Sequence, residues 1–317
     1  MTKYYLDNIY RINYCCRNID IPKVFKEKSD DVILFLNESC YFKNDTLKYS
    51  EYLKNLLNFV LISNIRQSNE NIKFKYFPED CVKLFQDSPT LVKSRMITNN
   101  PKYSILLKLD INRHFAPIYN VVEVDIPFEK KKNSLVWRGV TTGYGFDDSD
   151  QDLHPTSRQN LVERYCFHPN KNIDIGYSGL TQAAKLKKSY YGQFLKNQMS
   201  MRQLLEYKYI LSVEGNDVAS NLKWLLASNS VVFMPKPYIE SWILESHLKP
   251  YYHYIPVAND FSDLQIQLKW CNEHQKECKQ IVKNANEYMK MFLDEENEKQ
   301  IISSILEKYV RNVRFEE

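Results

Sequence analysis

The first 130 residues alternate short apolar runs with amphipathic stretches. Val32–Leu36, 72–77 and 103–109 are apolar runs of strand length, whereas 51–62 repeats its apolar residues at helical spacing. Strands that alternate with helices are typical of α/β domains. The pattern therefore predicts a first α/β domain.

The second half continues with the same alternation. We expect strands at 135–137, 209–213 and 230–234, and helices at 156–165, 180–194 and 217–228. The strand, helix and strand between 209 and 234 form one βαβ unit, which normally belongs to a parallel sheet. Near the C-terminus, apolar residues from Ile301 to Val310 recur at helical spacing, so the last helix buries one face.

A charged run at 129–133 interrupts the apolar pattern and is typical of a solvated linker. The length of 317 residues also exceeds what one hydrophobic core usually serves. We therefore expect two domains, residues 1–131 and 132–297.

Composition excludes some classes of protein. Hydrophobic residues make up 44% and the net charge is only +4, which favours a globular protein and disfavours a general nucleic-acid binder. The 23 tyrosines fit core and interface positions, although base stacking stays an alternative. Without an apolar run long enough to span a bilayer or an N-terminal signal core, we expect a cytoplasmic protein or one peripheral at the inner face of the membrane.

All seven glycines lie between Gly139 and Gly215, so tight turns and close backbone approaches are concentrated there. The segment 214–220 lies between the end of a predicted strand and the first turn of a predicted helix. Ligands bind at such ends in parallel sheets, and helix N-termini attract phosphate. Asn221 and Lys223 follow in the first helical turns. The alternative is an ordinary capped helix with Lys223 in solvent.

Other candidates carry weaker signals. Arg138, in Trp137-Arg138-Gly139, is expected at a strand end, where a guanidinium could hold phosphate oxygens. Asp87 precedes Ser88-Pro89 in a predicted short loop, which suits a catalytic carboxylate or a simple turn. Two basic sites in the first domain could equally be solvated surface, namely Lys93 with Arg95 and Arg113 with His114.

Cys271, His274 and Cys278 share a predicted helix face and superficially resemble metal ligands. A structural zinc site needs four ligands, so core packing is the favoured interpretation. The sequence contains no GxGxxG, Walker P-loop or GxSxG motif that would indicate a dehydrogenase, P-loop kinase or serine hydrolase.

In combination and order, these short blocks resemble glycosyltransferase family 90, the lipopolysaccharide A and CAP10-like group related to the protein O-glucosyltransferases. The resemblance covers about residues 135–290, and the first half matches less securely. The blocks are Trp137-Arg138-Gly139, Tyr207-Lys208-Tyr209, Glu214-Gly215-Asn216-Asp217 with Ala219 and Asn221-Leu222-Lys223, Trp242, Leu248-Lys249-Pro250, and His253 to Val257 with Asp260 and Leu264.

The resemblance implies a GT-B architecture, with two Rossmann-like domains facing across a cleft and the C-terminal helix, 298–317, packing back on the first. The first domain, 1–131, would then face the acceptor, and 132–297 would bind a UDP-sugar. Transfer in the family inverts the anomeric carbon and uses no metal, so no cofactor is expected. His253 to Val257 is expected to support the sheet rather than catalyse.

The resemblance also assigns roles to residues. The base that deprotonates the acceptor hydroxyl is expected to be Asp87, with Asp110 as the fallback, and Lys208 is a further donor-side candidate. The expected acceptor-side residues are Lys93, Arg95, Arg113 and His114. The expected donor site comprises Arg138, Gly139, Arg158, Glu214, Gly215, Asn216, Asp217, Val218, Ala219, Ser220, Asn221 and Lys223. Relatives have an arginine where this chain has Asn221, which shifts the expected diphosphate contact toward Lys223.

The resemblance implies a glycan or lipid-linked oligosaccharide acceptor, with lipopolysaccharide or another surface glycan as product, and no nucleic-acid partner. Two alternatives stay open: a catalytically degenerate protein that binds UDP-sugars or glycans, and a nucleic-acid binder that uses its Lys, Arg and Tyr residues. The identity of the sugar cannot be predicted.

Overall fold

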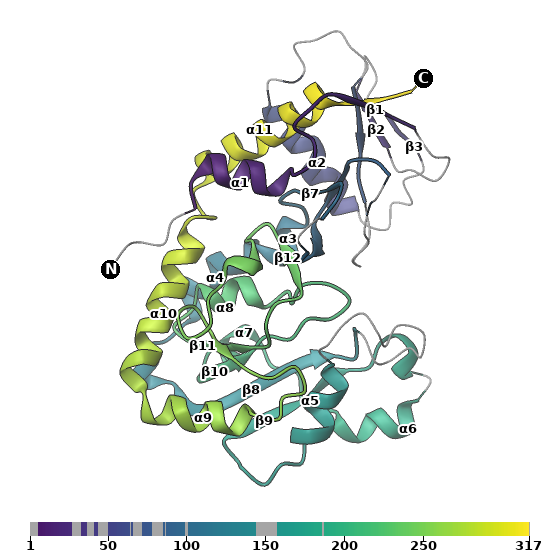
Figure 1. The fold of residues 1–317 in the computed structure, drawn as a ribbon. Coiled ribbons are helices and arrows are strands. Elements are labelled where there is room, and N and C mark those ends of the chain that lie inside the picture. The colour runs from purple at the N-terminus through teal and green to yellow at the C-terminus, as the bar shows by residue number, and fades with distance from the viewer. Residues whose placement is uncertain are drawn as a thin grey trace. The chain divides into compact units, whose positions relative to one another are not determined.

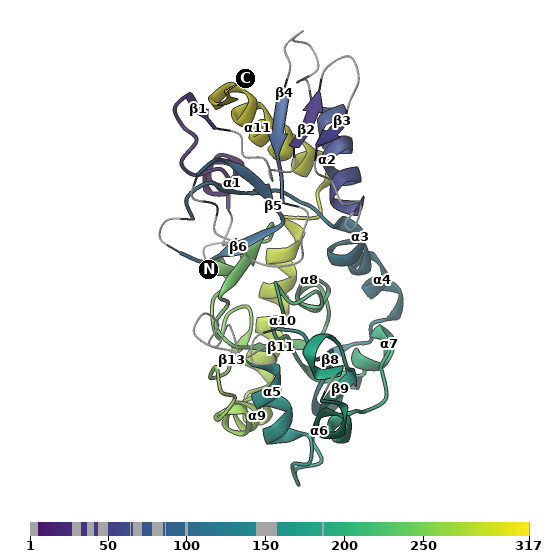
Figure 2. The same cartoon turned by 90° about the vertical axis from the view of Figure 1, so that its right-hand side faces the viewer.

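The computed structural model describes residues 6–26, 33–36, 41–43, 50–63, 65, 72–77, 85, 87–98, 101–143, 157–185 and 187–316. The chain divides into two compact units, and both are drawn in Figures 1 and 2. Unit 1 comprises residues 1–113, 239–244 and 291–317, and unit 2 comprises 114–238 and 245–290. The domain boundary expected near residue 131, which was placed at the charged run 129–133, stays a prediction.

Unit 1 is built from short strands and three longer helices. Its elements are α1 (Asn8–Cys15), β1 (Lys23–Phe25), β2 (Ile33–Leu36), β3 (Tyr41–Lys43), α2 (Ser50–Ile62), β4 (Ile72–Lys75), β5 (Thr90–Val92), β6 (Ser94–Met96), β7 (Ser104–Leu106), β12 (Ile239–Ser241), α11 (Glu295–Asn312) and β14 (Val313–Phe315), and α3 (Ile111–His114) begins in it. The predicted strands at 32–36, 72–77 and 103–109 and the predicted helix at 51–62 are confirmed by β2, β4, β7 and α2.

Within the described residues, the strands of unit 1 form four small sheets instead of one continuous sheet. β1 pairs with β14 and β5 with β7 in parallel, whereas β3-β2-β4 and β12-β6 are antiparallel. A Rossmann-like first domain therefore stays a prediction.

Helix α11 packs on α1 and α2 of unit 1. Its buried face carries Ile301, Ile302, Ile305, Leu306 and Tyr309, as the helical spacing predicts. Near its start, Glu298 is almost fully buried and binds two cations: Arg11 Nη2 lies 2.6 Å from Oε1, and Lys108 Nζ lies 2.9 Å from Oε2. The indole N–H of Trp242 donates to the same carboxylate. The C-terminal helix is thus fixed to unit 1 by both apolar and ionic contacts.

Unit 2 holds the longer strands. Its elements are α4 (Ala116–Val124), η2 (Phe128–Lys130), β8 (Lys132–Val140), α5 (Arg158–Tyr165), β9 (Ile173–Gly179), η3 (Gln182–Lys185), α6 (Lys188–Tyr191), η4 (Gly192–Phe194), α7 (Met201–Leu204), β10 (Tyr207–Leu211), α8 (Leu222–Leu226), β11 (Val231–Met234), η5 (Glu245–His247), β13 (Ile255–Pro256), α9 (Leu264–Glu273) and α10 (Gln275–Lys290).

The described part of unit 2 contains a five-stranded sheet in the order β13-β11-β10-β8-β9, and every pair in it is parallel. In chain order this is the doubly wound arrangement 2-1-3-4-5, whose switch point lies between its first and third strands, β8 and β10. The predicted βαβ unit and the sheet role of His253 to Val257 are confirmed by β10-β11 and β13.

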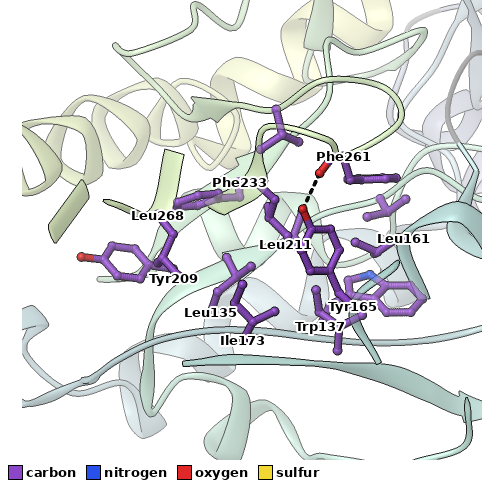
Figure 3. Packing of buried hydrophobic residues seen from close by; sticks show 14 of the residues in the cluster. Leu135, Trp137, Leu161, Tyr165, Ile173, Tyr209, Leu211, Phe233, Phe261 and Leu268 are labelled. Atoms are coloured by element: carbon purple, nitrogen blue, oxygen red, sulfur yellow. Dashed lines mark hydrogen bonds between the residues drawn. The ribbon is translucent and has the colours of Figure 1, made fainter. Parts of the chain in front are cut away.

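The core of unit 2 lies on this sheet, and Figure 3 shows part of it. Leu135 and Trp137 of β8, Leu211 of β10 and Phe233 of β11 are buried together. The Tyr165 hydroxyl donates to the Phe261 carbonyl at 2.7 Å, which satisfies a buried polar group. Burial of this apolar surface fixes the sheet and the ends of its strands.

Two predicted helices differ from the structure. The described residues of 180–194, all except 186, hold only short helical pieces, η3, α6 and η4, and the stretch 217–228 is helical only at Leu222–Leu226. In the second case the Gly215 N–H donates to the Asp217 carbonyl at 3.0 Å and the Val218 N–H donates to the Asp217 carboxylate. These local bonds compete with helix formation before Ala219.

Cys271 and Cys278 are fully buried, and Cys278 Sγ lies 3.6 Å from the Cys271 carbonyl oxygen, which confirms their prediction as core residues. Their placement on one helix face with His274 is wrong, because α9 ends at Glu273 and α10 begins at Gln275. The His274 ring instead stacks on Trp270 at 4.5 Å. Among the residues the structure describes, no helix is long and apolar enough to cross a membrane.

Candidate functional site

A pocket opens at the carboxyl end of the unit 2 sheet. Four segments form it: the end of β10, the end of β11, the stretch that leads into α8, and η5. Its lining is Ser212, Glu214, Val218, Ala219, Leu222, Met234, Pro235, Lys236, Pro237 and Glu245. Apolar walls with a few carboxylates and a lysine are typical of small-ligand sites.

Arg158 joins the loops that follow β8 and β10, on the two sides of the switch point. Its Nε donates to the Glu214 carbonyl at 3.0 Å, and its Nη2 donates to the Val213 carbonyl at 2.8 Å. Its Nη1 donates to the Val140 carbonyl at 3.0 Å and to Thr142 Oγ1 at 2.6 Å. Burial lowers the pKa of Arg158 to about 10, so it stays charged at neutral pH. Arg158 therefore acts as a brace, by which we mean that it holds the loops after β8 and β10 together.

The two loops approach closely because glycines face one another. Gly143 has φ +103°, and a Cβ built on it would lie 3.0 Å from the Gly215 Cα. A Cβ on Gly215 would lie 2.9 Å from Thr142 Oγ1 and 3.0 Å from Arg158 Nη2. The sequence predicted a close backbone approach at Gly215, and the structure places protein atoms there.

In the predicted segment 214–221, some residues line the pocket and others hold the surrounding loops in place. Val218 and Ala219 line the pocket, whereas Ser220 is exposed. Asn216 accepts a hydrogen bond from the Gly143 N–H at 2.7 Å, which joins the two loops again. Asn221 donates to the Leu211 carbonyl at 3.1 Å and accepts from Ser212 Oγ at 3.0 Å. Asn221 therefore holds the end of β10.

Glu214 lines the pocket, and its Oε1 accepts from the Tyr238 N–H at 3.1 Å. This bond connects the loops after β10 and β11. The carboxylate is thereby oriented at the pocket wall.

Lys223 is buried rather than in solvent, so the alternative of a solvated lysine is wrong. Its Nζ lies 3.6 Å from Glu245 Oε1, and both side chains are only 1% exposed. The ammonium also lies 5.5 Å from the centre of the Phe115 ring. Because a buried charge is costly without a partner, this ion pair offsets part of the cost of burying both side chains.

Arg138 is oriented toward β9. Its Nη2 forms an ion pair with Asp174 at 2.7 Å, and its other donors bind the carbonyls of Trp137, Asp174 and Asn197. Burial raises the pKa of Asp174, but hydrogen bonds from Arg138 and Lys196 outweigh it and hold that pKa below its ordinary value. Gly139 follows within β8. Lys208 donates to Gln275 at 2.8 Å.

The two candidate bases lie in unit 1. Asp87 is exposed in a bend before β5, which confirms the predicted loop. Asp110 is buried, has φ +58°, and forms an ion pair with Arg113 at 3.3 Å. The two carboxylates therefore differ in exposure, and the choice of base stays a prediction.

The acceptor-side candidates differ in exposure. Arg95 is fully buried and binds Glu240 at 2.9 Å and the carbonyls of Tyr14, Cys15 and Ser104. Lys93 is buried beside the Tyr52 ring, and His114 is buried. For these three residues the alternative of solvated surface is wrong. Only the Arg113 side chain is largely exposed, at 43%.

Sequence reasoning missed part of the pocket. Pro235-Lys236-Pro237 follows β11 directly, and Glu245 lies in η5. The first segment could have been found, because parallel strands place their carboxyl ends on the same edge and the end of β11 was predictable. Glu245 has no sequence signal of its own.

Comparison with known proteins identifies the family. Residues 121–317 match the model of glycosyl transferase family 90. The chain belongs to glycosyltransferase family 90. The match includes β8, the loops after β10 and β11, and α11, so the whole pocket lies within it.

Among curated relatives, the O-glucosyltransferase LpsA of Dichelobacter nodosus is 37% identical over 228 residues, which cover 72% of this chain and 64% of the relative. Protein O-glucosyltransferase 2 of Danio rerio is 32% identical and covers 58% of this chain and 32% of its own. The uncharacterized protein 179R of Invertebrate iridescent virus 6 is 29% identical over 56% of this chain and 17% of its own. The chain thus spans less than two thirds of the length of these relatives.

Proposed function

We propose that this protein transfers a hexose or pentose from a UDP-sugar to a hydroxyl group of a glycan, with inversion at the anomeric carbon. The observation that carries the proposal is the pocket at the carboxyl end of β10 and β11, within the part of the chain that matches family 90. Relatives named O-glucosyltransferases support sugar transfer as the reaction.

The donor nucleotide is proposed to occupy this pocket. The apolar wall of Val218, Ala219 and Leu222 would contact the base, and the Glu214 carboxylate would accept from the ribose hydroxyls. Lys236, which lines the pocket, would contact the diphosphate, and Lys223, paired with Glu245 of the same lining, would add positive charge from within the protein.

The structure changes how the diphosphate would be held. Because α8 has only five residues and Asn221 holds β10, a long helix N-terminus is not part of the proposal. Arg158 would act by fixing the loops, since its donors are bound to carbonyls and a hydroxyl. Arg138 would support the donor site indirectly, through its ion pair with Asp174 near the end of β8.

Asp87 is the proposed base. It would accept the proton of the acceptor hydroxyl as the oxygen attacks the anomeric carbon, while the bond to the UDP oxygen breaks on the opposite face. Positive charge at the pocket stabilises the departing diphosphate, so no metal ion is required in this proposal. The proposal also includes a GT-B arrangement of two domains. The acceptor would be lipopolysaccharide or another surface glycan, reached at the inner face of the membrane.

The test of the base is Asp87→Asn. Transfer should fall by about 10²–10⁴-fold, the usual contribution of general base catalysis, while UDP affinity stays the same. UDP release would be followed with UDP-glucose, UDP-galactose and UDP-xylose and a panel of oligosaccharide acceptors. Asp110→Asn tests the fallback base, and Glu296→Gln, whose side chain is 79% exposed in the parent, is the control. If Asp87→Asn transfers at the parent rate, Asp87 is not the base.

A further inference from the structure

Unit 1 contains a second pocket that no role yet explains. It has a volume of about 360 Å³ and is lined by Asn18, Asp20, Ile21, Lys23, Lys102 and Tyr103. These residues come from the turn after α1, the start of β1 and the segment before β7. We infer that this pocket is an acceptor subsite for an anionic saccharide, an inference that rests on the proposed transfer to a glycan.

The rim of the pocket is held in an unusual backbone conformation. Asn18 has φ +69° and Lys102 has φ +53°, and the Asn18 amide donates to the Lys102 carbonyl at 2.8 Å. Asparagine adopts the left-handed region readily, but lysine does so rarely. Such conformations persist only where the surroundings impose them, and they concentrate at binding sites.

The lining has the chemistry of a sugar site. The Tyr103 ring is held edge-to-face against the buried Phe25 ring at 5.3 Å, so it forms a fixed apolar surface that can cover the C–H face of a sugar. The planar amide of Asn18 and the carboxylate of Asp20 can exchange hydrogen bonds with vicinal hydroxyls. A volume of about 360 Å³ lies within the size range of small-ligand sites.

The charges favour an anionic ligand. Lys23 and Lys102 line the pocket, and the one acidic lining residue, Asp20, is already bound by Lys308 Nζ at 2.6 Å. The described lining residues therefore include two lysines and one carboxylate, which already has a cationic partner. A phosphate or carboxylate on the sugar would be attracted there.

Tyr103 also connects the pocket to the proposed base. Its N–H donates to the Phe85 carbonyl at 3.1 Å, and its carbonyl accepts from the Thr90 N–H at 2.9 Å. Phe85 and Thr90 lie on either side of Asp87 in the chain, so Tyr103 holds both ends of the segment that carries the carboxylate. A saccharide that stacks on Tyr103 is therefore bound beside a segment already implicated in acceptor activation.

The test is calorimetry on the full chain with glucose 6-phosphate, glucose and inorganic phosphate as probes. The variants are Lys23→Ser and Tyr103→Leu, which keeps the backbone bonds, and the control is Lys54→Ser, an exposed lysine of α2. Glucose 6-phosphate should bind the parent at least tenfold more tightly than glucose or phosphate. Each pocket variant should bind glucose 6-phosphate at least tenfold more weakly than the parent, and the affinity of the control variant should equal that of the parent.

Equal binding of phosphate and glucose 6-phosphate would show a simple anion site and overturn the inference, as would unchanged affinity in both pocket variants. UDP titrated in parallel separates the two proposals. If UDP binds while the sugar phosphate does not, only the inferred subsite fails. If the pocket variants lose sugar phosphate but the parent fails to bind UDP, the saccharide site stands and its acceptor role falls with the proposed function.

Discussion

At the scale of single residues, Arg158 shows how one side chain can organise a site without contacting a ligand. Its bonds to Val140 and Thr142 after β8 and to Val213 and Glu214 after β10 set the spacing of the loops. One guanidinium thus donates to three carbonyl oxygens and one hydroxyl.

Arg158→Met should therefore destabilise the protein. Each polar group left buried without a partner costs about 1–3 kcal/mol, so the free energy of unfolding should fall by about 3 kcal/mol or more. Urea unfolding measures this directly. Arg202→Met, which changes an exposed arginine of α7, is the matched control and should have little effect. Equal stability of both variants would contradict the role of Arg158 as a brace.

His253 predicts a pH dependence of stability. Burial, with a smaller contribution from Lys249, lowers the pKa of His253 to about 4, and its Nδ1 accepts from the Lys249 N–H at 2.9 Å. The unfolded chain, with a His pKa near 6.5, binds more protons between pH 4 and 6.5, so stability is full above about pH 6.5 and falls toward pH 4, by up to roughly 3 kcal/mol.

His253→Asn keeps a hydrogen-bond acceptor but cannot titrate. Its unfolding free energy should decrease less than that of the parent between pH 6.5 and pH 4.5, as measured by urea unfolding at both values. An identical decrease in parent and variant would exclude His253 as the titrating group.

Sequence reasoning at this scale located the site but not the contacts. The glycine distribution and the strand end at 209–213 led to Glu214 and Gly215, which the structure places at the pocket and the switch point. The orientation of Arg138 toward Asp174 and the pairing of Lys223 with Glu245 depend on residues 36 and 22 positions away. Such contacts arise from tertiary packing, which periodicity does not encode.

At the scale of elements, α11 combines an apolar face with one buried carboxylate. Glu298→Ala should lower the free energy of unfolding by about 3–5 kcal/mol, because Arg11 and Lys108 would lose their shared partner. Glu296→Ala, two residues earlier and 79% exposed, should change stability by less than about 0.5 kcal/mol. Thermal unfolding of both variants tests this, and a small effect at Glu298 would contradict it.

The loop after β8 gives a second prediction at this scale. Gly143→Ala should destabilise by about 1–2 kcal/mol or more, because φ +103° disfavours a side chain and the added Cβ meets Gly215. Gly192→Ala is the control, since no atom lies within 4 Å of its added Cβ and the residue is helical. If both changes have the same effect on the melting temperature, the close approach of the loops is not important for stability.

Strands were more predictable than helices in this chain. Continuous apolar runs such as 209–213 and 230–234 indicate buried strands, and β10 and β11 confirm them. The stretch 180–194 has apolar and aromatic residues at nearly helical spacing, yet Tyr191 and Phe194 pack into the core from short turns. Its local pattern was compatible with several backbone paths, and packing selected one.

At the scale of the whole molecule, the fold class was predictable and the chain path was not. One βαβ unit with parallel strands predicted the doubly wound sheet of unit 2. The return of 239–244 to unit 1, where Glu240 binds Arg95, has no sequence signature, because β12 is only three residues long. The family assignment depends on the order of short blocks, which local physics does not supply.

The central claim is that the pocket after β10 and β11 binds UDP, and calorimetric titration of UDP in the presence of EDTA tests it most directly. Glu245→Gln and the double variant Lys223→Met/Glu245→Gln are compared, so that no unpaired carboxylate remains when Lys223 is removed. The account predicts that the parent and Glu245→Gln bind UDP and that the double variant binds it at least tenfold more weakly. Equal affinity in the single and double variants, or no binding to the folded parent, would contradict it.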